Sequence, residues 1–230
     1  MTITVLQHTS LGSTFVASNT LAFPSNVTAG STILFAVRLG DTGFTFTVND
    51  NRNAGNYTQD IVLDLPIDGD RLIIGRMANV AAGATTLTFT ASSATKLGAG
   101  IVEVAGLATS SILDKTASAT NSSTAPNSGN TATTTVASEF IYSAVALDND
   151  NAETITGSGS TILLDSISDA STSFQCLAHG YQIVSSVGAY AGAYALTTSE
   201  EWACAVATYK SSGGGGTPIA VLASSYLQNL

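Results

Sequence analysis

The chain has 230 residues and a net charge of −9, and charged residues make up only 10% of it, against roughly 25% in a typical soluble domain. Its seven lysines and arginines are spread singly, so it lacks the clustered basic surface that nucleic acids and anionic membranes attract. No apolar run approaches the ~20 residues that span a bilayer. We therefore expect neither a nucleic acid nor a membrane as a partner.

The first residues, 1–6, lack the basic and long apolar parts of a signal peptide and begin with the alternation of a strand. We expect a protein made in the cytoplasm that leaves the cell, if it does, as virus particles do on lysis. Cys176 and Cys204 lie in strand-like segments. Without a secretory signal they are expected to be buried free thiols, and a disulfide between neighbouring strands is the alternative.

The first half of the chain is a succession of predicted strands separated by turn signals. Ile33, Phe35, Val37 and Leu39 recur with a period of two, which indicates a strand with one strongly apolar face. The strands predicted in this half cover residues 2–7, 13–17, 31–39, 44–48, 61–65, 72–77, 85–91 and 100–105.

The second half continues in the same way after residues 116–130, a segment rich in serine, threonine and asparagine. This segment is predicted to be a long surface loop or a connection that crosses between the halves, and a linker between two domains is the alternative. The strands predicted there cover residues 131–136, 140–147, 161–166, 174–184, 190–197 and 202–209. Strands without intervening helices pair antiparallel. The expected fold is therefore all-β, an antiparallel, jelly-roll-like β-sandwich over residues 1–210.

Two segments of the first half resemble segments of the second half. Residues 27–31 precede the apolar strand at Ile33, as residues 136–139 precede the one at Phe140. Residues 86–92 followed by 99–104 likewise resemble residues 194–199 followed by 203–207. The similarity predicts two related halves, about 1–110 and 111–210, and chance similarity between strands rich in threonine and alanine is the alternative.

Residues 211–230 are expected to be a linker and a docking tail. The four glycines at 213–216 make a flexible linker. Thr217 and Pro218 suit the start of a helix. A helix of only three turns is marginal in water, so it would form when the segment docks. Alternatively, the segment would bind in an extended form by adding a strand to a sheet. The tail is predicted to bind another protein, or else to fold back on its own sandwich. The residues expected to make the contact are apolar: Ile219, Val221, Leu222, Tyr226, Leu227 and Leu230.

No set of residues in the sequence predicts a catalytic, cofactor or metal site. Residues 148–153 resemble a calcium loop but lack its glycine, so a solvated acidic turn is expected. Glu103 and Glu139 lie in or beside apolar strands, and nothing in the sequence brings them together as a glycosidase would require. The sequence has no G-x-S-x-G nucleophile elbow, so nothing indicates that His8 or His179 belongs to a Ser–His–Asp catalytic site.

Aromatic residues offer one further possibility, a platform on which sugars stack. Trp202 and the tyrosines at 57, 142, 181, 190, 194 and 209 are the candidates, although Trp202 opens an apolar strand, which favours a place in the core.

Several segments of strand and turn resemble β-sandwich proteins encoded by bacteriophages and found on some bacterial surfaces. These segments are Val27-Thr28-Ala29-Gly30 and residues 50–58, 78–83, 102–107 and 202–210. The resemblance implies a virion component without enzyme activity. We expect a capsid decoration or cement protein that forms a homo-oligomer, with a trimer favoured, and binds the major capsid protein or another virion protein. The alternatives are a glycan-binding receptor-recognition module of a phage tail or adhesin, and a polysaccharide-cleaving enzyme.

Overall fold

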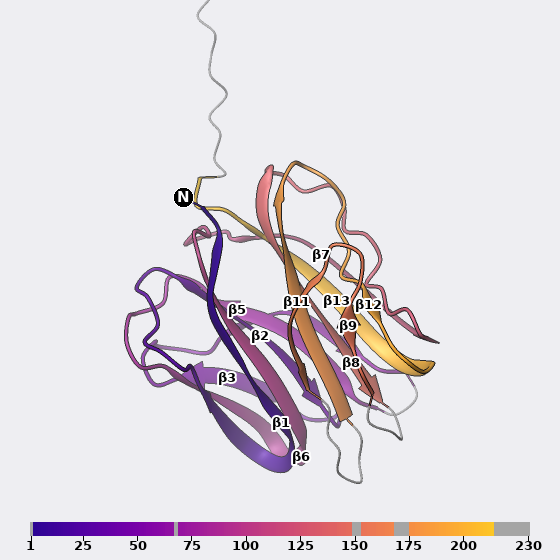
Figure 1. Ribbon diagram of the computed structural model, residues 1–230. Helices are drawn as coiled ribbons and strands as arrows, with labels where there is room; N and C mark the ends of the chain where they lie inside the picture. The colour runs from indigo at the N-terminus through magenta and orange to yellow at the C-terminus, as the bar shows by residue number, and fades with distance from the viewer. Residues whose placement is uncertain (1, 67–68, 149–152, 168–174, 214–230) are drawn as a thin grey trace, which may run out of the picture.

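The computed structural model describes residues 2–66, 69–148, 153–167 and 175–213. These residues form two antiparallel β-sheets packed face to face (Figure 1), and the described ranges contain no helix. The predicted all-β sandwich is confirmed.

One sheet is built entirely from the first half of the chain. Its path from edge to edge is β4-β5-β2-β6-β1, with β3 paired to the first part of β6. The long strand β6 pairs with β1 along most of its length and with β2 through its second part. The strands are β1 (Thr4–Ala22), β2 (Thr32–Leu39), β3 (Phe46–Asp50), β4 (Thr58–Asp64), β5 (Arg71–Met77) and β6 (Thr86–Ala105).

The other sheet comes entirely from the second half, in the order β10-β11-β8-β13-β7, and a two-stranded ribbon, β9 with β12, accompanies it. The chain therefore completes one sheet before it begins the next. The strands are β7 (Leu113–Ser123), β8 (Ser138–Asp148), β9 (Thr156–Gly157), β10 (Ile162–Ile167), β11 (Gln175–Ser185), β12 (Tyr194–Ala195) and β13 (Glu200–Lys210).

The two sheets have the same topology. Reading both paths in the same direction, β4 corresponds to β10, β5 to β11, β2 to β8, β6 to β13 and β1 to β7. The small pair of β9 with β12 takes the place that β3 and the start of β6 have in the first half. Each half of the chain is thus the same five-stranded unit.

A bulge in the first sheet fixes how the two units align. The pairing of β4 with β5 shifts register between Gln59 and Ile61, and Gly75 lies opposite Gln59. A Cβ atom at Gly75 would collide with the backbone oxygen of Thr58. Only glycine fits opposite this bulge without moving the neighbouring strand.

The second sheet repeats this arrangement. The pairing of β10 with β11 shifts register between Leu163 and Asp165, and Gly180 lies opposite Leu163. A Cβ atom at Gly180 would lie 2.7 Å from the backbone oxygen of Ile162. The same bulge faces the same glycine in both halves, so residues can be matched between the units one by one.

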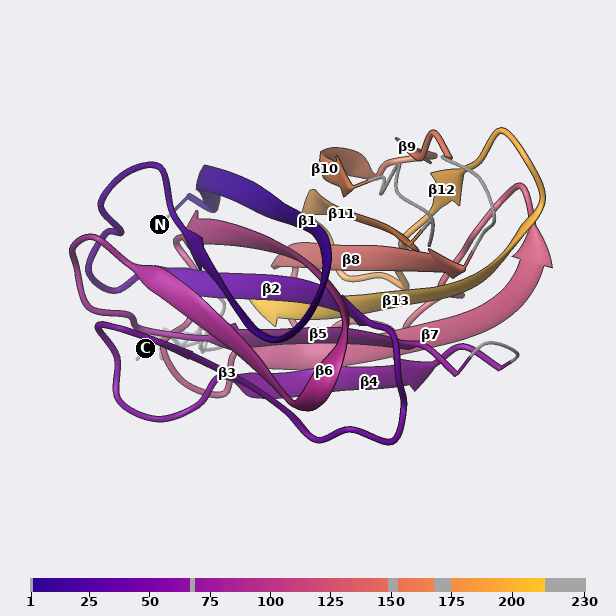
Figure 2. The ribbon, with the colours of Figure 1, turned by 90° about the horizontal axis from the view of Figure 1, so that it is seen from below.

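The sheets pack with their strand orders running in opposite directions. The edge strand β1 lies against β10, and at the other side β4 lies against β7; Figure 2 shows the two layers and both edges. Since β1 corresponds to β7 and β10 to β4, the two edges are equivalent. The sandwich therefore has approximate two-fold symmetry about an axis between β2 and β8, as an isologous dimer has.

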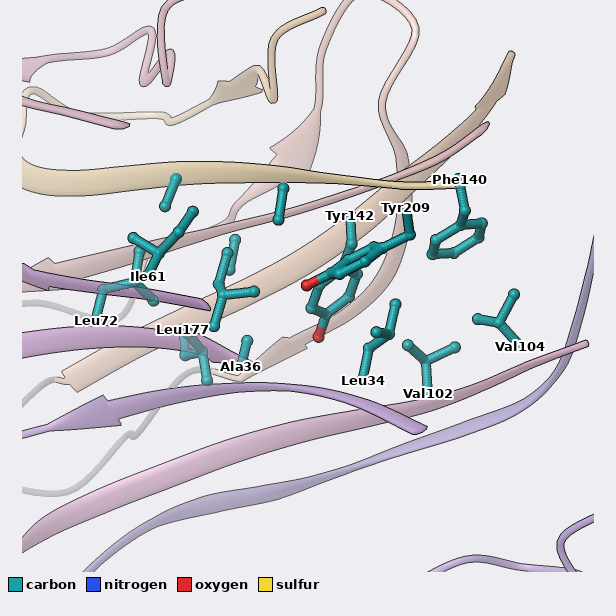
Figure 3. Packing of buried hydrophobic residues seen from close by; sticks show 14 of the residues in the cluster. Leu34, Ala36, Ile61, Leu72, Val102, Val104, Phe140, Tyr142, Leu177 and Tyr209 are labelled. Carbon is teal, nitrogen blue, oxygen red and sulfur yellow. The ribbon is translucent and has the colours of Figure 1, made fainter. Parts of the chain in front are cut away.

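The space between the sheets is filled by side chains from both layers. In Figure 3, Leu34, Val102 and Val104 of one sheet point toward Phe140 and Tyr209 of the other. Burial of this apolar surface is the main stabilising contribution to the sandwich.

The outer face of each sheet is covered as well. Phe35 and Phe89 belong to a second cluster, on the far face of the first sheet, which β3 and the loops close over. Tyr194, Leu196 and Trp202 belong to a third cluster, on the far face of the second sheet. Strand β2 is consequently buried on both sides along its whole length.

Three local predictions in the second half differ from the structure. Residues 190–197 were expected to be a strand, but only Tyr194–Ala195 form one. Residues 116–130 were expected to be a loop, but residues up to Ser123 form the edge strand β7, which pairs with β13 on one side. Residues 131–136 were expected to be a strand and are irregular. An edge strand that buries little of either face needs no apolar alternation, so β7 lacks the usual pattern.

Candidate functional site

The two histidines of the chain meet at the edge where β1 lies against β10. His8 Nδ1 and His179 Nε2 each lie 3.0 Å from the same oxygen, Oδ2 of Asp165. The hydroxyl of Tyr142 lies 2.9 Å from the other nitrogen of His179. Strands β1, β10, β11 and β8 each supply one member, so this cluster joins the two sheets through side chains.

The chemistry of these groups determines which atoms donate the hydrogen bonds and which accept them. An ionised carboxylate only accepts hydrogen bonds, so both His8 Nδ1 and His179 Nε2 donate to Asp165. Neutral His179 then has its free lone pair on Nδ1, which accepts the hydrogen bond from Tyr142. The cluster is complete when His179 is neutral and Asp165 is charged.

The surroundings of His179 and Asp165 favour the same protonation states, a neutral imidazole and a charged carboxylate. His179 is fully buried, which lowers its pKa below 6.5 more than the neighbouring carboxylate raises it. Burial alone would raise the pKa of Asp165, but the hydrogen bonds from His179 and His8 outweigh it and lower that pKa. The His8 side chain, 40% exposed, forms the solvent side of the cluster.

The equivalent positions at the opposite edge hold no ionisable group. The pair that follows the bulge is Ile61 with Ile74 in the first sheet, where the second sheet has Asp165 with His179. Following the strand registers outward from the bulges, the residue that corresponds to His8 is Thr116. The cluster therefore departs from the symmetry of the fold. The shared fold does not require it, because the other half packs two isoleucines at the same positions.

Glu103, a candidate for carboxylate chemistry, is buried and fully hydrogen-bonded. Its Oε1 accepts bonds from the Thr28 amide at 2.7 Å and the Ser31 hydroxyl at 2.8 Å, and its Oε2 accepts one from Gln7 at 2.6 Å. These contacts hold the turn before β2 against β6. The arrangement is that of a structural carboxylate.

Glu139 occupies the position that Ser31 has in the other half. It is buried like Glu103, but its polar surroundings are different. In the described part of the chain neither of its carboxyl oxygens has a hydrogen bond of normal geometry. Thr208, the Val136 amide and the carboxylate of Asp114 are its polar neighbours. Burial, followed by the charge of Asp114, raises the pKa of Glu139 to about 7.

The side chains considered for sugar stacking are mostly in the cores. Trp202 is buried and donates a hydrogen bond from Nε1 to Ser123 at 3.1 Å. Four of the tyrosines, Tyr57, Tyr142, Tyr194 and Tyr209, are buried as well. They cannot form an exposed platform.

The cysteines and the acidic turn have structural environments. Cys176 and Cys204 are free and buried, as expected, and burial raises the pKa of Cys204. In the acidic turn, residues 149–152 lie outside the described residues. Glu153 accepts hydrogen bonds from the hydroxyls of Thr197 and Thr198, each at 2.6 Å, and so fastens the loop before β13. Among the described residues no three acidic, histidine or cysteine side chains could hold a metal ion.

A pocket of about 350 Å³ lies where the chain leaves the sandwich; we call it the exit pocket. Gly106 accepts a hydrogen bond from the Ser212 amide at 2.8 Å and packs on the backbone of Thr2, so both ends of the described chain meet here. The lining residues are all uncharged: Thr28, Ala29, Gly30, Ser31, Ala105, Gly106, Leu107, Thr109 and Ser212.

The residues predicted to bind a partner lie in the segment that follows. Ile219, Val221, Leu222, Tyr226, Leu227 and Leu230 are outside the described residues. The structure therefore leaves their role as a prediction. What it adds is the surface beside which that segment begins.

Comparison with known proteins gives no relative for this chain: no family model, curated protein or solved structure matches it. The described residues include no helix of the length and apolar character needed to cross a membrane.

Sequence reasoning missed the histidine cluster because its members are far apart along the chain and belong to different sheets. One signal was available. If the two halves are aligned at Gly75 and Gly180, a polar pair, Asp165 and His179, stands where the first half has two isoleucines.

Proposed function

We propose that this protein is a structural component of a bacteriophage particle, a decoration or cement protein that attaches to the capsid through the segment after Ser212. The proposed partner is the major capsid protein or another virion protein. The protein would act as a homo-oligomer, for which a trimer is favoured.

The observation that carries the proposal is the exit of the chain. Among the residues that the structure describes, the three apolar clusters run from Ile3 to Tyr209. After Ser212 come four glycines and then the uncharged, apolar segment 217–230. A sandwich that already has its own apolar clusters, followed by a linker of four glycines and an apolar segment, has the organisation of a folded body with a tether.

Repetition makes such a tether effective. A short flexible linker gives the second contact an effective concentration in the millimolar range, so modest contacts add up when many copies bind one lattice. Sheets covered on both faces suit a body that must stay folded on a particle surface. This combination favours attachment over catalysis as the role of the chain.

The test compares the full chain with a version that ends at Ser212. Each is mixed with phage particles that lack the protein, and binding is measured by co-sedimentation. We expect the full chain to bind to saturation and the shortened chain to stay in solution, while both show the same thermal unfolding.

Point variants keep the test specific. Leu222→Asp should abolish sedimentation with particles, and Ser225→Ala, a change at a polar position of the same segment, should preserve it. Equal binding by the full and shortened chains would refute the attachment through this segment.

A further inference from the structure

The histidine cluster lies between two edge strands that no backbone ladder joins. Strand β1 pairs with β6 in one sheet and β10 with β11 in the other, and β1 and β10 meet only across the sandwich. The hydrogen bond from His8 to Asp165 therefore crosses from one sheet to the other. Any change that weakens the cluster weakens this edge first.

Protonation is such a change, because the cluster needs a neutral His179. A second proton on the His179 ring would occupy Nδ1, which now accepts the hydrogen bond from Tyr142. It would also place a cation in a fully buried position. Opening the edge to water removes both costs, so acid favours the open form.

Titratable groups face His179 from several of the strands around it. Asp165 comes from β10, His8 from β1 and Tyr142 from β8, and Tyr194 stands beyond Tyr142. From β6 comes Gly100, whose missing side chain leaves room for the imidazole. One carboxylate thus faces two imidazoles, and protonation of His8 makes a proton on His179 still less favourable.

We propose that His8, Asp165, His179 and Tyr142 form an acid-sensitive latch that holds β1 against β10 at neutral pH and releases this edge as the pH falls. The opposite edge has Ile61, Ile74 and Thr116 in the equivalent positions and holds no histidine. There Asp60 of β4 pairs with Arg76 and accepts a hydrogen bond from Tyr209 of the other sheet at 2.8 Å. As the pH falls, the β1–β10 edge therefore opens before the opposite edge. This inference does not depend on the proposed function.

The test is hydrogen exchange of the full chain followed by mass spectrometry at pH 7.5, 6.5 and 5.5, with intrinsic exchange rates corrected for pH. Uptake of one proton on opening raises the opening constant by up to about tenfold per pH unit. We expect amides of β1 and β10 to lose protection by that factor below pH 6.5. Amides of β4, a strand that carries neither histidine and does not hold Asp114 or Glu139, should not lose protection in this way and serve as the internal control.

Variants copied from the other half of the chain make the result specific. Asp165→Ile combined with His179→Ile reproduces the pair at Ile61 and Ile74, and should remove the pH dependence of β1 and β10. His8→Gln should lower protection but keep the same pH slope, because the buried imidazole remains. An unchanged slope in the double variant, or its loss in His8→Gln, would refute the latch.

A measurement on the unmodified chain keeps the proposal testable if the double variant does not fold. With two histidines in the sequence, NMR resolves each imidazole. We expect the His179 ring to stay neutral until the β1 edge opens. A His179 ring that takes up a proton while the β1 amides stay protected, or equal pH dependence at both edges of the sandwich, would overturn it.

Discussion

Replacing the buried carboxyl of Glu139 by an amide should stabilise the protein at neutral and alkaline pH. Glu139 begins β8, is fully buried, and stands next to the carboxylate of Asp114. Glutamine has the shape of a protonated glutamate and never ionises. Glu139→Gln therefore isolates the cost of the buried charge.

The size of the effect follows from the pKa. Glu139 has a pKa of about 7 in the folded protein, against 4.5 for the ordinary group. Because the folded pKa is raised, the unfolded chain loses its proton first as the pH rises. The stability that this group contributes is complete below pH 4.5 and is lost by pH 7. At ~1.36 kcal/mol per pH unit, the loss at pH 8 amounts to about 3 kcal/mol.

The assay is urea unfolding of the wild type and Glu139→Gln at pH 4.5, 6 and 8, with linear extrapolation to water. Comparison at each pH removes the contributions of all other titrating groups. The two proteins should be about equally stable at pH 4.5. At pH 8 the variant should be more stable by about 2–3 kcal/mol.

Glu103→Gln is the matched control, since Glu103 is buried to a similar degree but accepts three hydrogen bonds. An amide turns one of its oxygens into a donor that faces other donors. This variant should lose about 1–3 kcal/mol at pH 6 and 8. A constant difference between wild type and Glu139→Gln across the pH range would refute the reasoning, as would a variant that is less stable at pH 8.

Two further predictions concern the bulges and the thiols. Gly180→Ala should cost about 2 kcal/mol or more in urea unfolding, because its Cβ meets a backbone oxygen at 2.7 Å, whereas Gly12→Ala, in open space, should change stability by less than about 0.5 kcal/mol. Equal effects would contradict the assigned bulge. Cys176 and Cys204 should resist thiol reagents in the folded protein and react fully in denaturant; rapid labelling of the native chain would show that this face of the second sheet is open.

The sequence was a good guide wherever a strand buries at least one face. The alternation through Ile33, Phe35 and Val37 predicted β2, although both faces proved to be buried. It failed for β7, whose residues around Ala117 are small and polar and are held mainly by the ladder to β13. Backbone hydrogen bonds place no requirement on the type of side chain. An edge strand held mainly by such bonds therefore cannot be recognised from the alternation of apolar residues.

Long continuous strands were also broken up by pattern reading. Strand β1 was predicted as two pieces, residues 2–7 and 13–17, and β6 as residues 85–91 and 100–105. Bulges interrupt the period of two in the pairing of β1 with β6, as between Leu11 and Thr14. In the sequence, this break in the alternation resembles a turn between two strands. In the structure, it is a bulge within one continuous strand.

The candidate site was beyond prediction for a different reason. His8 and Asp165 are 157 positions apart, and their contact exists only because the two halves of the chain pack with their strand orders reversed. Nothing local in either segment indicates a partner. The arrangement could be read only after the symmetry of the two sheets was known.

The proposed attachment through the segment after Ser212 is tested most directly by a reconstruction of particles of the phage that is proposed to carry this protein. The proposal predicts density for the sandwich on the outer shell in a fixed number of copies, with the exit pocket end toward the shell and continuous density from Ser212 into a neighbouring molecule. A sandwich bound by another face, with the density after Ser212 directed into solvent, would contradict it.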